Sequence, residues 1–243
     1  MKEPWYEEWF DSPYYHILYE HRNDEEAERF IHLLTEKLHV VHGSNILDAA
    51  CGKGRHSKTL ARLGFHVTGI DLSESNIAAA KKIEEKNLHF EEWDIREVYR
   101  ENSFDYVFNL FSSFGYFEDT ADDQQVVTSF AKSLKPGGTL VLDYINSQYA
   151  VKHIKAREII PRGEIQFHIK KRIEKGFIKK KIEFLVAGTD HQFEESLKLI
   201  NLRLFEEMFQ HAGFAITHLF GDYELNEFNS SSSPRLILVA KKM

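Results

Sequence analysis

Three aspartates and a short glycine turn are the residues whose types and spacing best suit chemistry. Gly52 and Gly54 follow Asp48 closely, and Asp71 and Asp94 come later in the chain. Glycine removes side chains where a ligand must approach the backbone. One carboxylate can accept hydrogen bonds from both hydroxyls of a ribose, and another can accept from an adenine amino group. The set therefore predicts a site for an adenosine-containing ligand.

Strands and helices alternate in the part of the chain that carries these residues. Apolar runs and helical spacing predict strands over 46–50, 65–70, 88–92, 104–110 and 139–145, and helices over 58–63, 74–85 and 122–134. This alternation indicates βαβ units and a parallel sheet that is covered on both faces. Ligands bind such sheets at the carboxyl ends of the strands. Asp48, Asp71 and Asp94 are therefore expected along one rim.

The whole chain is expected to form a single α/β domain, with a doubly wound, mostly parallel, seven-stranded Rossmann-like sheet. Two last strands follow a helix near the C-terminus, and an antiparallel β meander is expected as an insertion over the sheet edge. The expected segments are an N-terminal helical cap (1–43), a cofactor-binding half (44–145), the antiparallel insertion (146–200), and a C-terminal helix with the last two strands (201–243).

Composition excludes several classes of protein. Of the 243 residues, 42% are hydrophobic, which supports a sizeable core and excludes a disordered chain. The single cysteine, Cys51, excludes an internal disulfide and fits a reducing compartment. No apolar run approaches the roughly 20 residues that span a bilayer, and the acidic N-terminus lacks the layout of a secretion signal. The net charge of −7 disfavours bulk attraction to nucleic acid or anionic lipid. A cytoplasmic protein without membrane association is expected.

The glycine turn suits either a dinucleotide or a sulfonium cofactor, and two residues favour the second. A dinucleotide fingerprint has a third glycine where Ser57 stands, and it holds a pyrophosphate near the start of the helix. Asp48 lies four residues before Gly52, and its negative charge suits a ligand with positive amino and sulfonium groups. A nicotinamide oxidoreductase is therefore disfavoured.

The motifs resemble those of class I S-adenosylmethionine-dependent methyltransferases. Residues 47–54 (Leu-Asp-Ala-Ala-Cys-Gly-Lys-Gly) are similar to the first motif of that family, and residues 69–73 (Gly-Ile-Asp-Leu-Ser) to its second. Residues 134–138 (Leu-Lys-Pro-Gly-Gly) resemble the turn before its fifth strand, and residues 110–117 resemble a subgroup that mostly modifies small molecules. The resemblance implies S-adenosyl-L-methionine as cofactor and a small-molecule methyl acceptor.

The resemblance also implies a set of cofactor-binding residues. In related enzymes an N-terminal helix closes over the cofactor, where Tyr15 would face the sulfonium and Arg22 would pair with the methionine carboxylate. Packing of this helix onto the core is the alternative interpretation of the tyrosine. The implied set is Asp48, Ala50, Gly52, Gly54, Asp71, Leu72, Asp94, Ile95, Asn109, Leu110, Tyr15 and Arg22.

Methyl transfer from a sulfonium is an in-line displacement, and positioning of the reactants can supply most of its rate. An amine or hydroxyl acceptor also requires the removal of a proton. The candidates for that base are Tyr116, Tyr144, His168 and His191. No metal site is predicted, because the histidines and acids lack the dense spacing of metal ligands.

A basic hairpin leaves other acceptors open. Residues 170–181 carry seven basic side chains: Lys170, Lys171, Arg172, Lys175, Lys179, Lys180 and Lys181. A solvated strand pair that resists aggregation is the favoured interpretation. The alternatives are a tRNA or protein methyltransferase, and a cofactor-binding module without transfer activity. Nucleic acid is disfavoured because the hairpin has no interleaved exposed aromatic residues. A monomer and a homodimer both remain compatible with the sequence.

Overall fold

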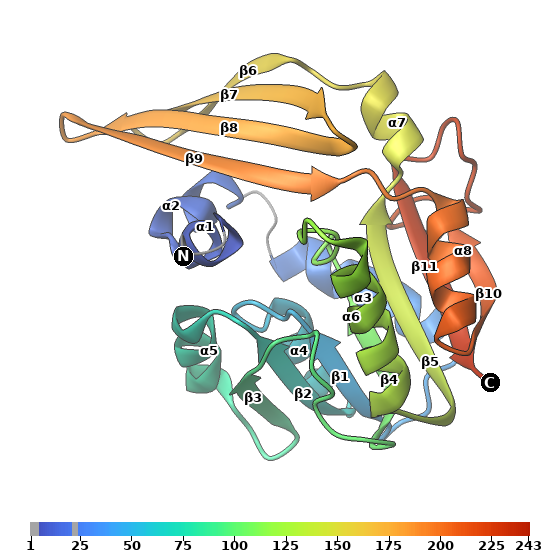
Figure 1. Cartoon of the computed structure of the whole chain (residues 1–243). Coiled ribbons are helices and arrows are strands. Elements are labelled where there is room, and N and C mark those ends of the chain that lie inside the picture. The colour runs from blue at the N-terminus through green and yellow to red at the C-terminus, as the bar shows by residue number, and fades with distance from the viewer. Residues whose placement is uncertain (1–4, 21–23) are drawn as a thin grey trace.

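The computed structural model describes residues 5–20 and 24–243, without the side chain of Glu7. The strands of its main sheet are β1 (Asn45–Ala49), β2 (His66–Asp71), β3 (Leu88–Glu92), β4 (Phe104–Asn109), β5 (Leu134–Ile145), β10 (Phe214–Phe220) and β11 (Arg235–Lys242). Their order is β10-β11-β5-β4-β1-β2-β3 (Figure 1). The five strands from β5 to β3 are parallel, and β11 runs antiparallel to both β5 and β10. The expected mostly parallel, seven-stranded sheet is confirmed.

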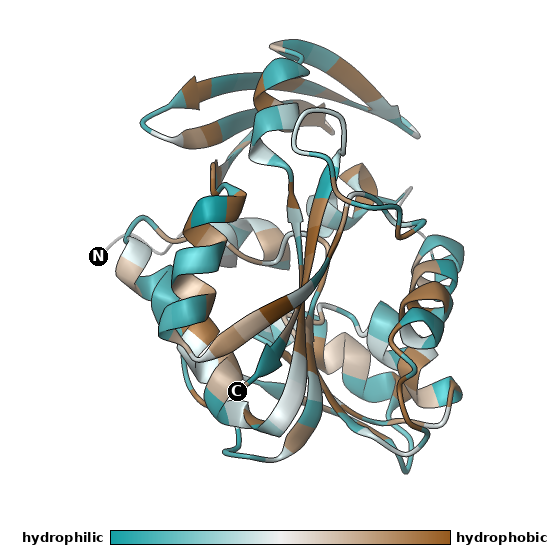
Figure 2. Cartoon of the chain, turned by 90° about the vertical axis from the view of Figure 1, so that its right-hand side faces the viewer, coloured by the Kyte–Doolittle hydropathy of each residue, from teal (hydrophilic) through white to brown (hydrophobic). Residues whose placement is uncertain are grey.

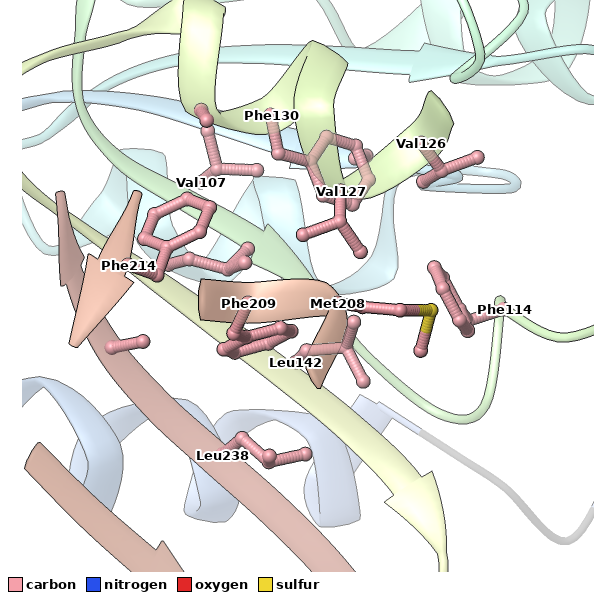
Figure 3. Packing of buried hydrophobic residues seen from close by; sticks show 14 of the residues in the cluster. Val107, Phe114, Val126, Val127, Phe130, Leu142, Met208, Phe209, Phe214 and Leu238 are labelled. Carbon is pink, nitrogen blue, oxygen red and sulfur yellow. The ribbon is translucent and has the colours of Figure 1, made fainter. Parts of the chain in front are cut away.

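Helices cover both faces of this sheet. They are α3 (Asp24–Lys37), α4 (Arg55–Arg62), α5 (Glu74–Ala80) with a 3-10 turn (Lys81–Ile83), α6 (Thr120–Ser133) and α8 (Leu202–His211). Figure 3 shows Phe130 of α6 and Phe209 of α8 in the apolar cluster that these helices share with β4 and β5. A second cluster joins α3 and α4 to β1 and β2 through residues such as Ile31 and Leu60. Figure 2 accordingly shows apolar strands in the middle and polar helix surfaces outside. None of the described helices is long and apolar enough to cross a bilayer.

A second, four-stranded sheet is inserted between β5 and α8. Its strands are β6 (Arg157–Arg162), β7 (Ile165–Glu174), β8 (Phe177–Val186) and β9 (Thr189–Lys198), all antiparallel, and the helix α7 (Ser147–Lys152) leads into it. Three of these strands match the expected meander. The additional strand β6 is short and contains Pro161, which weakens its strand pattern and confines it to an edge.

Two short helices, α1 (Trp5–Asp11) and α2 (Pro13–Leu18), lie between the two sheets (Figure 1). We call them the helix pair. Trp9 and Leu18 are buried in a cluster with Phe167 and Phe184 of the inserted sheet. The insertion thus lies beyond the helix pair, on the carboxyl-end side of the main strands (Figure 1), and not over the sheet edge that we expected. The physical reason is that its apolar face needs a partner, and the helix pair supplies one.

Glutamates on neighbouring strands neutralise most of the basic hairpin. On the outer face of the inserted sheet, Lys170 and Lys181 both pair with Glu183 at 2.8 Å. Arg172 and Lys179 share a second glutamate on the same face, Glu194. On the inner face, Lys171 pairs with Glu158 and Lys180 with Glu195. Alternating charges of this kind favour the interpretation of a solvated, edge-protected sheet.

Candidate functional site

A cavity of about 400 Å³ lies between the helix pair and the carboxyl ends of β1, β2, β3 and β4. The floor comes from the loops that follow these strands and from the first turns of α4 and α5, and the roof comes from α1, α2 and the residues just after them. Its lining residues are Tyr6, Phe10, Tyr15, His16, Tyr19, Glu20, Asp24, Ala50, Cys51, Gly52, Lys53, Arg55, His56, Asp71, Leu72, Asn76, Trp93, Asp94, Ile95, Leu110, Phe111, Ser113, Tyr116 and Phe117. Eight of the twelve implied cofactor residues are among them.

The glycine turn and Asp71 form one hydrogen-bonded unit in the floor. The carboxylate of Asp71 accepts hydrogen bonds from the backbone N–H groups of Gly52 at 2.8 Å and Ser73 at 3.0 Å. Burial raises the pKa of this carboxyl above its usual value, and the two backbone bonds oppose that shift. Gly52 has φ +57°, and a side chain there would meet nothing within 4 Å. The turn therefore leaves open space beside a carboxylate that still has lone pairs to offer.

Three other implied residues support the turn from beneath and do not line the cavity. Asp48 is buried and accepts a hydrogen bond from the hydroxyl of Ser57. Asn109 is buried and donates to the backbone oxygen of Ala49 at 2.9 Å. A side chain at Gly54 would lie 2.4 Å from the ring of Phe90, so that glycine permits close packing between α4 and β3.

A buried carboxyl with a raised pKa gives a testable pH dependence. Desolvation raises the pKa of Asp48 to about 6, against the hydrogen bond from Ser57. The folded state therefore holds this proton more tightly than the unfolded state does, and stability from this group is lost as pH rises from about 4 through 6. Between pH 5 and pH 7.5 the loss is expected to be about 1 kcal/mol.

The variant Asp48→Asn isolates this group, because all other acids are common to both proteins. Denaturant unfolding at pH 5 and at pH 7.5 should show the variant gaining about 1 kcal/mol relative to wild type at the higher pH. A difference between the two proteins that stays constant with pH would show that Asp48 does not titrate in this range.

The far end of the cavity is built around Asp94. Leu72, Trp93 and Ile95 flank it in the lining. Its carboxylate accepts a bidentate set of hydrogen bonds from Arg96, at 2.9 Å to Nε and 2.5 Å to Nη2. The guanidinium of Arg96 lies 5.0 Å from the ring centroid of Phe117. The acid at this strand end is therefore held in place by an arginine that the sequence motifs did not reveal.

The loop after β4 is strained and clamped. Phe111 and Ser112 are consecutive non-glycine residues with φ of +60° and +62°, a costly backbone geometry. The carboxylate of Asp143 accepts from the N–H of Phe111 at 2.8 Å. Arg235 donates to the same carboxylate at 2.6 Å and to the hydroxyl of Ser112 at 2.8 Å. Both charged side chains are buried. This clamp fixes the loop that supplies Leu110 and its neighbours to the cavity.

Only one of the four candidate bases lines the cavity. Tyr116 does so, and its hydroxyl donates to the backbone oxygen of Ser112 at 2.5 Å. Tyr144 is fully buried, and its hydroxyl donates to the backbone oxygen of Lys198 at 2.5 Å. Its role is therefore packing, because it has no surface in the cavity.

The two histidine candidates also lie elsewhere. His191 packs against the rings of Tyr14 and Phe184, with centroids 4.8 and 5.1 Å away. His168 is exposed on β7. Neither lines the cavity, because both belong to the inserted sheet, whose apolar face packs against the helix pair.

The helix pair contributes more of the lining than the sequence indicated. Tyr15 lies in the cavity as expected, and Arg22 lies outside the described residues. The sequence motifs gave no indication of Tyr6, Phe10 or His16. The sequence does carry many aromatic residues before position 20. Their helical spacing could have indicated a ring-lined helix that covers the cavity.

Comparison with known proteins agrees with this geometry. Residues 46–138 match the model of a methyltransferase domain family. The chain is 28% identical over 187 residues to the dTDP-3-amino-3,4,6-trideoxy-alpha-D-glucopyranose N,N-dimethyltransferase of Streptomyces venezuelae, which covers 73% of this chain and 78% of that protein.

Solved structures share the fold. An S-adenosylmethionine-dependent methyltransferase from Clostridium acetobutylicum ATCC 824 superposes with a TM-score of 0.77 at 18% identity, over 90% of this chain and 92% of the other. The amino pentose methyltransferase CalS10 from Micromonospora echinaspora, solved with bound S-adenosylmethionine, gives a TM-score of 0.72 at 20% identity, over 96% and 98%. The methyltransferase-domain match, the Streptomyces venezuelae relative and the motifs at 47–54 and 69–73 together support a class I S-adenosylmethionine-dependent methyltransferase, and the solved structures show the shared fold.

Proposed function

We propose that this enzyme transfers a methyl group from S-adenosylmethionine to an amino group of a small molecule. The observation that carries the proposal is the cavity of about 400 Å³, which joins a strand-tip carboxylate to an aromatic roof. Its volume is in the range that suits small ligands. The open space at Gly52 and the hydrogen-bond capacity of Asp71 fit an adenosine with its methionine tail.

Residues of the floor would hold the cofactor. Asp71 would accept hydrogen bonds from the ribose, and Leu72 and Ile95 would pack on the adenine beside Asp94. Ala50, Gly52 and Leu110 would contact the methionine part, and Tyr15 would face the positive sulfur. Asp48, Gly54 and Asn109 would act through the shape of the turn, because none of the three lines the cavity.

Positioning and exclusion of water would supply most of the catalysis. When bound, S-adenosylmethionine supplies a methyl group activated by a positively charged sulfur. Phe10, Tyr15 and Tyr116 line the cavity and would keep water from it. The hydroxyl of Tyr116 donates its hydrogen bond to the backbone oxygen of Ser112, so toward an N–H of the methyl acceptor it would serve as a hydrogen-bond acceptor.

An amine is the acceptor class that two similarities support. The Streptomyces venezuelae relative is named for N,N-dimethylation of an amino sugar, and CalS10 is named as an amino pentose methyltransferase. The charges of the described lining do not select the acceptor, because Glu20 and Asp24 are paired with Arg162 and Lys58. The ion pairs of the basic hairpin weaken the alternative of a tRNA or protein acceptor.

Methyl-labelled S-adenosylmethionine tests this function. The purified protein should label small amines, including amino sugars linked to nucleoside diphosphates, and should label the matched hydroxyl compounds at least tenfold less. Labelling of tRNA or protein in place of the amines would overturn the proposal. Cofactor binding with no labelled product from any of these acceptors would favour a binding module without transfer activity.

The variant Asp71→Ala is expected to weaken binding of S-adenosylhomocysteine by about 1–3 kcal/mol, because charged hydrogen bonds to the ribose are lost. Asp105→Ala is a matched control. Asp105 also accepts a backbone N–H, from Asn45 at 2.8 Å, but it does not line the cavity. Isothermal titration should show unchanged affinity for the control. Equal affinities for wild type and Asp71→Ala would remove this acid from the site.

A further inference from the structure

Asn76 carries a buried polar atom that has no hydrogen-bond partner. The residue lies in α5, is only 4% exposed, and lines the cavity. Its side-chain oxygen Oδ1 is buried without a partner in the structure. Its backbone N–H is fixed by the hydroxyl of Ser73 at 3.1 Å. Buried acceptors in native proteins are nearly always satisfied, so this one indicates a ligand that donates a hydrogen bond.

Two side chains of different elements surround Asn76. Its amide interacts with the carboxylate of Asp71, which follows β2, and with the imidazole of His16, in α2 of the helix pair. All three residues line the same cavity. The helix pair is also tied to α5 directly, since the hydroxyl of Ser73 donates to Asp11 at 2.6 Å. The helix pair therefore contacts the floor at this end of the cavity.

His16 is suited to a neutral ligand group. Partial burial lowers its pKa, and the nearby charge of Lys53 lowers it further, against the opposing effects of Asn76 and Asp11. A neutral imidazole has one donor and one acceptor nitrogen. Asp71 and Asn76 offer acceptors, so the three side chains together match a pair of adjacent hydroxyl groups, each of which can donate once and accept.

We propose that Asn76 Oδ1 accepts a hydrogen bond from one ribose hydroxyl of the cofactor, and that His16 contacts the same diol from above. The carboxylate of Asp71 accepts a hydrogen bond from the other ribose hydroxyl. This assignment rests on the proposed function. Asn76 and His16 would then determine specificity for the ribose. The diol would also connect the helix pair to the floor of the cavity.

Binding of S-adenosylhomocysteine and of its 2′-deoxy and 3′-deoxy analogues tests the assignment. Wild type should bind the parent compound at least tenfold more tightly than one of the analogues. Asn76→Leu keeps the branching at Cγ and removes the acceptor, so it should shrink that ratio at least fivefold. Asn76→Ala provides the same test if the leucine variant fails to fold. Glu74→Gln, at an exposed position of the same helix, should leave the ratio unchanged.

A loss of affinity that is equal for all three ligands would mean that Asn76 has only a structural role, and would overturn the proposal. A wild-type protein that binds none of the three would instead defeat the proposed function. His16→Phe keeps a ring in α2, and it should shorten the residence time of the parent compound at least threefold but not that of the discriminated analogue. Equal shortening for both would overturn the role of His16.

Discussion

Replacement of Arg235 by Met is expected to lower the free energy of unfolding by about 3–5 kcal/mol, because it leaves the buried charge of Asp143 without its partner. The Asp143 side chain is fully buried, and that of Arg235 is 11% exposed. Denaturant unfolding measures this loss. A change below about 1 kcal/mol would show that the pair contributes no more than a surface salt bridge.

A double variant separates stability from function at this clamp. Arg235→Met with Asp143→Leu removes both charges, and apolar replacement of a buried pair is often close to neutral. At least half of the lost stability should return. Methyl transfer should remain reduced at least tenfold, because the N–H of Phe111 has lost its acceptor and the strained loop is no longer held. Recovery of activity together with stability would contradict a positioning role.

Replacement of Glu195 by Gln is expected to cost about 2–3 kcal/mol and to loosen the helix pair. Glu195 accepts hydrogen bonds from the indole of Trp9 at 2.7 Å and the hydroxyl of Tyr19 at 2.8 Å, and it pairs with Lys180 at 3.3 Å. The side chains of this ion pair are 11% and 17% exposed, so Lys180 would lose its counter-charge in a largely desolvated place and keep its hydrogen bond to Tyr19. Dissociation of S-adenosylhomocysteine should become at least fivefold faster.

The neighbouring residue Glu194 offers a matched control. It lies on the opposite, outer face of β9, where it pairs with Arg172 and Lys179. Glu194→Gln should cost less than about 1 kcal/mol and leave ligand dissociation unchanged. Stopped-flow displacement compares the two variants. Equal rates for them would mean that the inserted sheet does not hold the roof of the cavity.

Residues that line the floor of the cavity could be located from the sequence because the floor is built from local segments. The glycine turn at 52–54 and the acid at 71 each sit where a buried strand ends, and the strand pattern is visible in a short window. The parallel order of the strands then follows from right-handed crossovers. The main sheet and the seven implied residues of the cavity floor were therefore within reach of motif and periodicity.

The roof and the clamp depend on contacts between distant segments, which no short window contains. Trp9 and Glu195 are 186 residues apart in the chain, and Asp143 and Arg235 are 92 apart. The position of Tyr144 at a strand end suggests a candidate base, yet side chains alternate along a strand, and this one points into the core. Sequence spacing does not decide which face of β5 meets the cavity.

The central claim is that the cavity beneath the helix pair binds S-adenosylmethionine. The melting temperature of the purified protein tests it most directly, because only a ligand of the folded state raises this temperature. S-adenosylhomocysteine at saturating concentration should raise it by several degrees, and NAD at the same concentration should leave it unchanged. A rise with NAD and none with S-adenosylhomocysteine would contradict the account.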